Sequence, residues 1–135
     1  MSVRKFKFEK LVRDKIVDGI KEAGNTPVYF ALKGDEFVNE LKQKVLEEAM
    51  EVPNEESKEE LLKELADVQE VLDNLVEALG SSKEEIQEIQ KKKNDKAGSF
   101  KKRLYIKHVE TQPDSDWVDH YLASPEKYPE ITEES

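Results

Sequence analysis

The chain has no cysteine among its 135 residues and only two histidines, His108 and His120. The absence of cysteine excludes disulfides, zinc–thiolate sites and thiol nucleophiles. Two histidines near the C-terminus offer little material for a histidine-based metal site or a catalytic triad. Any metal chemistry of this chain therefore points to oxygen ligands.

Long apolar runs are also missing. The longest uncharged stretches fall far short of the roughly 20 apolar residues that span a membrane, and residues 1–5 lead into no apolar signal region. We therefore expect a cytoplasmic protein that makes no contact with a membrane.

The chain is rich in charge and poor in apolar side chains. Hydrophobic residues make up 36% and charged residues 39%, and 22 basic against 31 acidic residues give a net charge of -9. An acidic chain is a poor binder of nucleic acid, whose phosphates need lysine and arginine. The low apolar content favours amphipathic helices that bury one side against a second subunit, so we expect a homodimer or homotetramer. Concentrated carboxylates also suit hard divalent cations.

Apolar residues recur at helical spacing through most of the chain. The pattern predicts four helices, over residues 9–23, 36–52, 58–79 and 83–97. Ser57 and Ser82 each precede a glutamate by three residues, which is typical of a capping box. Gly24-Asn25, Pro53 and Gly80 are expected to end helices. The fold class is therefore predicted to be all-α, an antiparallel helical bundle.

Two segments read instead as short strands. Residues 26–32 are β-branched and aromatic, and residues 100–109 alternate apolar with charged or polar side chains. We expect them to pair as a small two-stranded β element at the edge of the bundle. Residues 1–110 would then form one domain. Residues 111–135 would form an acidic tail in which 117–122 is a short docking helix, with Trp117 and Tyr121 serving to dock the tail rather than to stack on a base.

Four carboxylates on two neighbouring predicted helices are the most informative feature. Glu48 and Glu51 are three residues apart, as are Glu64 and Asp67, so each pair projects from one face of its helix. The connection at residues 53–58 is short, so the two helices should return antiparallel and bring the four carboxylates together.

Such a cluster needs positive charge, because burying an unpaired carboxylate costs several kcal/mol. Magnesium fits, since it takes oxygen ligands and leaves positions open for water and phosphates. Glutamates three apart are common on solvated helix faces, and that alternative is weighty. Position favours the metal: Glu48 lies within the apolar stripe between Val45 and Val52, where a solvated glutamate would not be placed.

The residues carry a resemblance to a known family. Glu-Glu-x-x-Glu at residues 47–51, followed by Glu-x-x-Asp at 64–67, resembles the all-α nucleotide pyrophosphohydrolases of the MazG type. Residues 10–16 (Lys-Leu-Val-Arg-Asp-Lys-Ile) and 91–100 resemble its phosphoribosyl-ATP pyrophosphohydrolase-like, house-cleaning branch. The resemblance covers about residues 9–109. One departure is Pro53, which ends the helix that carries Glu48 within a turn of Glu51. The pocket for the nucleobase would therefore come from another subunit or from the N-terminal segment.

The resemblance implies a role for each carboxylate. Glu48, Glu51, Glu64 and Asp67 would be magnesium ligands, with manganese as a substitute. Glu48 and Glu47 would be the catalytic pair, Glu47 being an additional ligand or orienting the attacking water. An exposed helix residue is an equally good interpretation of Glu47, because neighbouring side chains diverge.

The resemblance also implies phosphate-binding residues: Arg13, Lys15, Lys92, Lys93 and Asn94. Arg13 is favoured over Lys15 because its planar fork binds oxyanions in pairs. The alternatives are an ion pair for Arg13 and, for the lysine run, a helix C-terminus favoured by the helix dipole.

The function implied is magnesium-dependent hydrolysis of nucleoside triphosphates to monophosphate and pyrophosphate, clearing aberrant or surplus nucleotides. Two alternatives stay open: hydrolysis of phosphoribosyl-ATP in histidine biosynthesis, and a non-catalytic helical interaction module. The sequence does not specify the nucleobase or the sugar.

Overall fold

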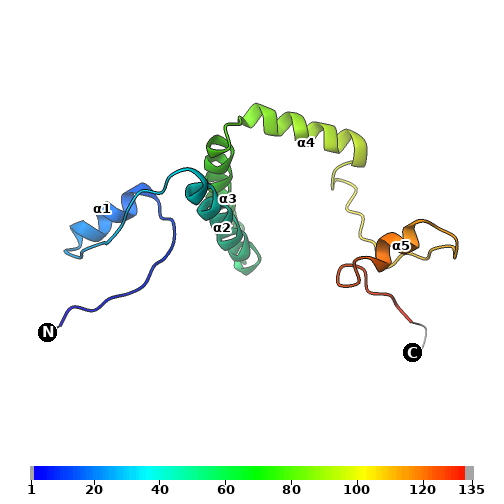
Figure 1. Cartoon of the computed structure of the whole chain (residues 1–135), viewed down its shortest axis with the longest axis horizontal. Helices are drawn as coiled ribbons and strands as arrows, with labels where there is room; N and C mark the ends of the chain where they lie inside the picture. The colour runs from blue at the N-terminus through cyan, green and yellow to red at the C-terminus, as the bar shows by residue number, and fades with distance from the viewer. Residues whose placement is uncertain (1, 133–135) are drawn as a thin grey trace. The chain divides into compact units, whose positions relative to one another are not determined.

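The computed structural model describes residues 2–132, and the chain separates into two compact units, residues 1–97 and 98–135. All regular elements in the described residues are helical (Figure 1), which agrees with the predicted all-α class. Residues 98–110 group with the C-terminal unit. None of the described helices has the length and apolar character needed to cross a membrane.

The first unit is built around a helical hairpin (Figure 1). Helix α2 (Gly34–Glu51) runs into a short 3-10 turn, η1 (Val52–Asn54), and helix α3 (Lys58–Ala78) packs back along α2. Pro53 lies in the turn, where its missing N–H removes no bond of the α2 ladder. The predicted bundle is therefore represented, within one chain, by two antiparallel helices.

The predicted capping serines begin their helices as expected. The Ser57 hydroxyl accepts a hydrogen bond from the Glu60 N–H at 3.1 Å, and the Ser82 hydroxyl accepts one from the Glu85 N–H at 3.1 Å. Each bond satisfies one of the free N–H groups in a first helical turn. At the end of α3, Gly80 has φ +73, a left-handed conformation that glycine adopts without strain.

Two further helices complete the unit. Helix α1 (Asp14–Glu22) begins later than residue 9, because Arg13 has an extended backbone at its N-cap. Helix α4 (Lys83–Ala97) touches α3, and no helix–helix contact between α1 and the hairpin is found in the described residues. The segment before α1, rather than α1 itself, reaches the hairpin.

The predicted β element is wrong for the described residues. Residues 26–32 and 100–109 contain no strand, and they belong to different units of the chain. A strand is stabilised by a paired neighbour rather than by its own residues. Each segment has side chains that favour strands, but it has no neighbouring strand with which to form backbone hydrogen bonds. Its backbone is therefore irregular.

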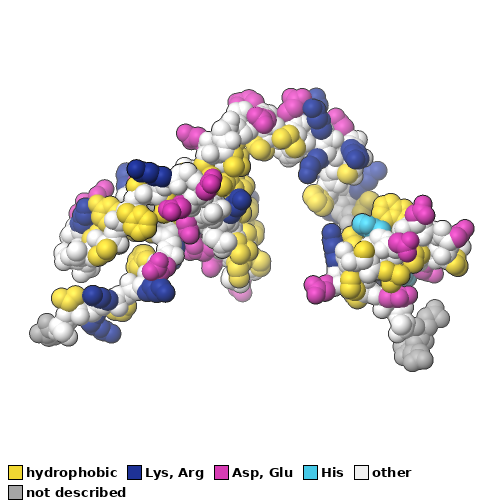
Figure 2. Space-filling view, viewed as in Figure 1, with side chains coloured by type: hydrophobic (Ala, Val, Ile, Leu, Met, Phe, Trp, Pro, Cys, Tyr) yellow, Lys and Arg dark blue, Asp and Glu magenta, His cyan; other side chains and the backbone are white. Residues whose placement is uncertain are grey.

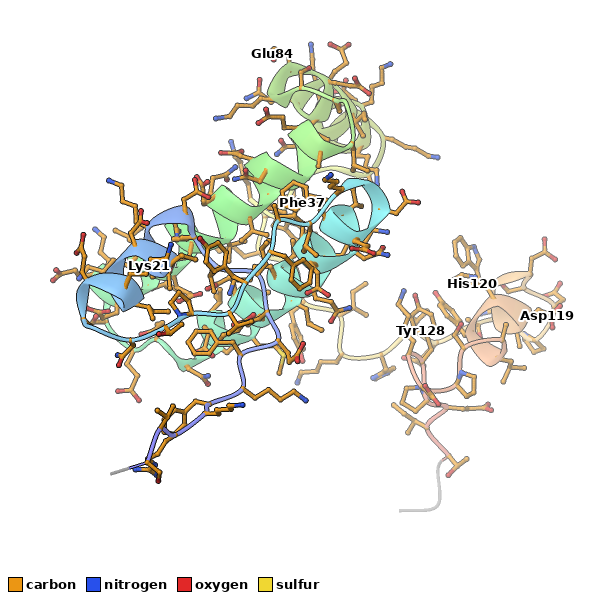
Figure 3. All side chains as sticks on the ribbon, turned by 60° about the vertical axis from the view of Figure 1, so that its left-hand side comes forward. Lys21, Phe37, Glu84, Asp119, His120 and Tyr128 are labelled. Atoms are coloured by element: carbon orange, nitrogen blue, oxygen red, sulfur yellow. The ribbon has the colours of Figure 1, made fainter. Side chains whose placement is uncertain are left out.

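The C-terminal unit contains one short helix, α5 (Trp117–Leu122), where the docking helix was expected. Aromatic rings pack within this unit. The ring centroids of Trp117 and Tyr121, which are stacked, lie 6.1 Å apart. Those of His120 and Tyr128, both labelled in Figure 3, lie 5.8 Å apart. A shallow hollow of about 400 Å³ is lined by residues 109–112, Ser115, Trp117 and Tyr121. It includes none of the predicted site residues.

The helical hairpin buries very little. Leu41, which is 3% exposed, and Val71, which is 9% exposed, are the buried apolar side chains among the described residues. Leu46, Met50, Leu65 and Leu72 stay exposed on the same two helices, as does Leu79 just past the end of α3. Hydrophobic side chains gather along one side of the hairpin (Figure 2). The contacts around Leu41 and Val71 set how α2 and α3 face each other, and with it the position of the carboxylates.

Candidate metal centre

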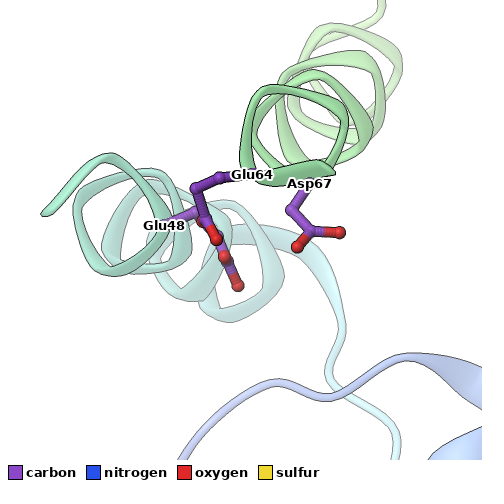
Figure 4. Close-up of side chains that lie close together, drawn as sticks. All are labelled: Glu48, Glu64 and Asp67. Atoms are coloured by element: carbon purple, nitrogen blue, oxygen red, sulfur yellow. The ribbon is translucent and has the colours of Figure 1, made fainter. Parts of the chain in front are cut away.

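Three of the predicted ligands converge between α2 and α3. Glu48 projects from α2, while Glu64 and Asp67 project from α3 into the same space (Figure 4). One carboxylate oxygen from each lies within 4.8 Å of the others. The predicted spacing therefore brings Glu48, Glu64 and Asp67 together, and all three side chains are partly shielded from solvent.

The fourth predicted ligand, Glu51, is not part of this group. It is the last residue of α2 and is exposed. Its charge still acts on the cluster, because it helps to raise the pKa of Glu64.

Glu64 is the clustered residue whose pKa is raised by its neighbours. The neighbouring Glu48 carboxyl, which can share a proton with it, raises the pKa of Glu64 to about 7, helped by burial and by the charges of Glu48, Asp67 and Glu51. A hydrogen bond between two carboxyl groups needs one of them protonated. When both are ionised, Glu64 Oε1 is shielded from water and no donor in the described residues reaches it.

Glu47 faces a different environment from Glu48. Its two oxygens are held by two lysines, Lys10 Nζ at 3.6 Å from Oε1 and Lys44 Nζ at 3.3 Å from Oε2. Glu47 lies outside the clustered oxygens. The predicted pair Glu47–Glu48 is thus divided: Glu48 faces the cluster, and Glu47 faces cations.

Lys44 is a site residue that the sequence prediction missed. Its side chain is 17% exposed, and its ammonium lies 3.8 Å from Glu48 Oε1 as well as 3.3 Å from Glu47. The signal was present, because Lys44 precedes Glu47 by three residues and Glu48 by four on one helix. Lys10 was also missed, and it carried no comparable local signal.

The predicted phosphate-binding residues are not gathered into one place. Arg13 reaches the cluster, donating a hydrogen bond from Nη2 to Asp67 Oδ1 at 2.8 Å. Lys15 is exposed in the first turn of α1. Lys92, Lys93 and Asn94 are exposed on α4. Like Lys15, they form no side-chain hydrogen bond or ion pair with any described residue.

The donor set suits a hard divalent cation. Three carboxylate oxygens from two rigid helices converge without any nitrogen or sulfur ligand, which is the chemistry that magnesium and manganese accept. The oxygen of Glu64 that lacks a donor is the kind of atom that a cation satisfies.

Comparison of the chain with protein-family models, with curated proteins and with solved structures gives no significant match.

The Glu64 carboxyl should make the metal-free protein lose stability as the pH rises. Its folded-state pKa lies above the ordinary value, so its contribution is fully present below about pH 4.5 and is lost as the pH rises through about 7. Glu64→Gln keeps a neutral side chain throughout. We measure the free energy of unfolding with urea in the presence of a chelator. The value for Glu64→Gln minus the value for wild type should increase between about pH 5 and about pH 8.

Glu84→Gln is the matched control, since Glu84 lies exposed in the first turn of α4 (Figure 3). Its difference from wild type should stay constant over the same range. If the free energies of unfolding of wild type and Glu64→Gln changed in parallel with pH, the raised pKa of Glu64 would be contradicted.

Proposed function

We propose that this chain is a magnesium-dependent nucleoside triphosphate pyrophosphohydrolase of the MazG type, which releases a monophosphate and pyrophosphate. The observation that supports it best is the convergence of Glu48, Glu64 and Asp67 within 4.8 Å from two helices. Like charges at this distance repel, and Glu64 Oε1 is shielded from water with no donor among the described residues. A bound cation would relieve the repulsion and satisfy that oxygen.

The charge balance of the site supports the binding of a divalent ion. Five carboxylates, those of residues 47, 48, 51, 64 and 67, face three cations, those of Lys10, Arg13 and Lys44. Two negative charges are left over when all five are ionised. One divalent cation would neutralise these two charges.

In the proposed reaction, water adds to the α-phosphorus, the bond to the bridging oxygen breaks, and pyrophosphate leaves. A magnesium ion at this site would neutralise phosphate charge and make water a better nucleophile. Glu48, Glu64 and Asp67 would hold it, and Glu47 would orient the water, since its lysine partners keep it outside the cluster. Arg13 would bind phosphate oxygens.

The test is pyrophosphate release from a panel of nucleoside triphosphates, with and without magnesium. We expect turnover only with magnesium, and we expect Glu48→Gln to lower kcat/KM by more than about a hundredfold, above the usual loss for residues that merely support a ligand. Glu84→Gln should keep the wild-type rate. Magnesium-independent turnover, or an active Glu48→Gln, would contradict the proposed site. If no nucleotide is hydrolysed, phosphoribosyl-ATP is the next substrate, and inactivity there would favour the non-catalytic module.

We also propose that the chain works as a homodimer in which two helical hairpins form a four-helix bundle. The hairpin buries two apolar side chains among the described residues, Leu41 and Val71, and leaves others exposed along α2 and α3. A second copy would cover these exposed side chains. A second copy would also offer Lys92, Lys93 and Asn94 a route to the substrate phosphates.

Three exposed leucines, two on α3 and one at its C-cap, indicate where the second copy would bind. Leu65, Leu72 and Leu79 are 45%, 38% and 62% exposed and lie seven residues apart. Seven residues are close to two helical turns, so these side chains form one line along the helix. Such a line is the usual seam between helices of different subunits. A second copy brings an identical line, which makes this surface self-complementary.

Sedimentation velocity of the full chain tests the dimer. Wild type should sediment at twice the 15.6 kDa chain mass, and Leu72→Glu should shift it to the monomer by placing a charge in the seam. Leu104→Glu is the control: it makes the same change at an 82% exposed leucine outside the hairpin, and it should remain dimeric. A wild type that sediments as a monomer would contradict the proposal.

A further inference from the structure

The N-terminal segment supplies two of the three cations around the carboxylates. Lys10 reaches Glu47 on α2, and Arg13 reaches Asp67 on α3. Leu11 and Val12, between them, are partly buried, while residues 2–10 are exposed. The segment is therefore held by these apolar residues as well as by its ion pairs, and Arg13 can change partner while the segment stays in place.

Arg13 and a cation compete for the same carboxylate. Asp67 is one of the three clustered ligands, and its Oδ1 already accepts the 2.8 Å hydrogen bond from Arg13. The pair is exposed, with side chains 59% and 43% accessible, and exposed pairs contribute little stability. A divalent cation close to Asp67 also repels the guanidinium. Lys44 differs, because its partners lie on its own helix and its side chain is mostly buried.

From these contacts we infer that Arg13 is an exchangeable counter-ion of the site, an inference that rests on the proposed function. Without metal, Arg13 neutralises Asp67. When a divalent cation takes Asp67, Arg13 is released and binds the phosphate oxygens of the substrate that arrives with the metal. The single hydrogen bond to Asp67 leaves most of the guanidinium donors free for a second partner.

The exchange predicts opposite effects of one substitution on two ligands. Removing a competitor strengthens metal binding, so Arg13→Gln should bind Mn²⁺ about two- to fivefold more tightly than wild type, the effect expected for an exposed ion pair. With saturating magnesium, the same variant should bind pyrophosphate about tenfold more weakly or worse, because a charge-assisted hydrogen bond is lost. Titration calorimetry on the full chain measures both affinities.

Lys7→Gln is the matched control, since it removes the same charge six residues away, from an exposed side chain with no ion pair or side-chain hydrogen bond among the described residues. It should leave both affinities near wild type. Weaker Mn²⁺ binding by Arg13→Gln would overturn the exchange and make Arg13 a residue that positions Asp67 as a ligand. Equal effects from both substitutions, or unchanged pyrophosphate binding by Arg13→Gln, would also overturn it. If the wild-type chain binds no Mn²⁺, the result would instead contradict the proposed function itself.

Discussion

The repulsion between carboxylates that α2 and α3 hold together is the constraint on which the site depends. The helices meet around Leu41 and Val71, and this packing carries Glu48 into the space occupied by Glu64 and Asp67. Repulsion at this separation must be relieved by a proton, by a basic side chain or by a metal ion. The metal-free chain uses the first two, through the raised pKa of Glu64 and through Arg13 and Lys44.

The same hairpin would link the proposed metal binding to the proposed assembly. A pair of helices with two buried apolar side chains has little packing energy with which to hold repelling charges in place. Covering the Leu65–Leu72–Leu79 line with a second copy would add that packing, and metal binding would remove the repulsion. Each contribution makes the other easier, since anything that binds only the folded state stabilises it.

The parts of the fold that the sequence predicted well are governed by local rules. Ser57 and Ser82 cap helices, Gly80 ends one, and Pro53 separates α2 from α3, because each effect depends on residues within a turn. The cluster of Glu48, Glu64 and Asp67 followed from helical spacing plus a short connection. The strands failed because pairing depends on distant residues. Glu51 lies outside the cluster although it is still the last residue of α2. Lys10 could not be predicted, since its partner lies far along the chain.

Paramagnetic broadening by Mn²⁺ tests the central claim most directly. In an amide spectrum of the full chain, substoichiometric Mn²⁺ should first broaden the signals of residues close to Glu48, Glu64 and Asp67, while signals from the acidic residues of the C-terminal unit stay sharp. Glu64→Gln should weaken this selectivity. Broadening spread evenly over the acidic residues, or strongest outside the α2–α3 hairpin, would show that the converging carboxylates are not a metal site.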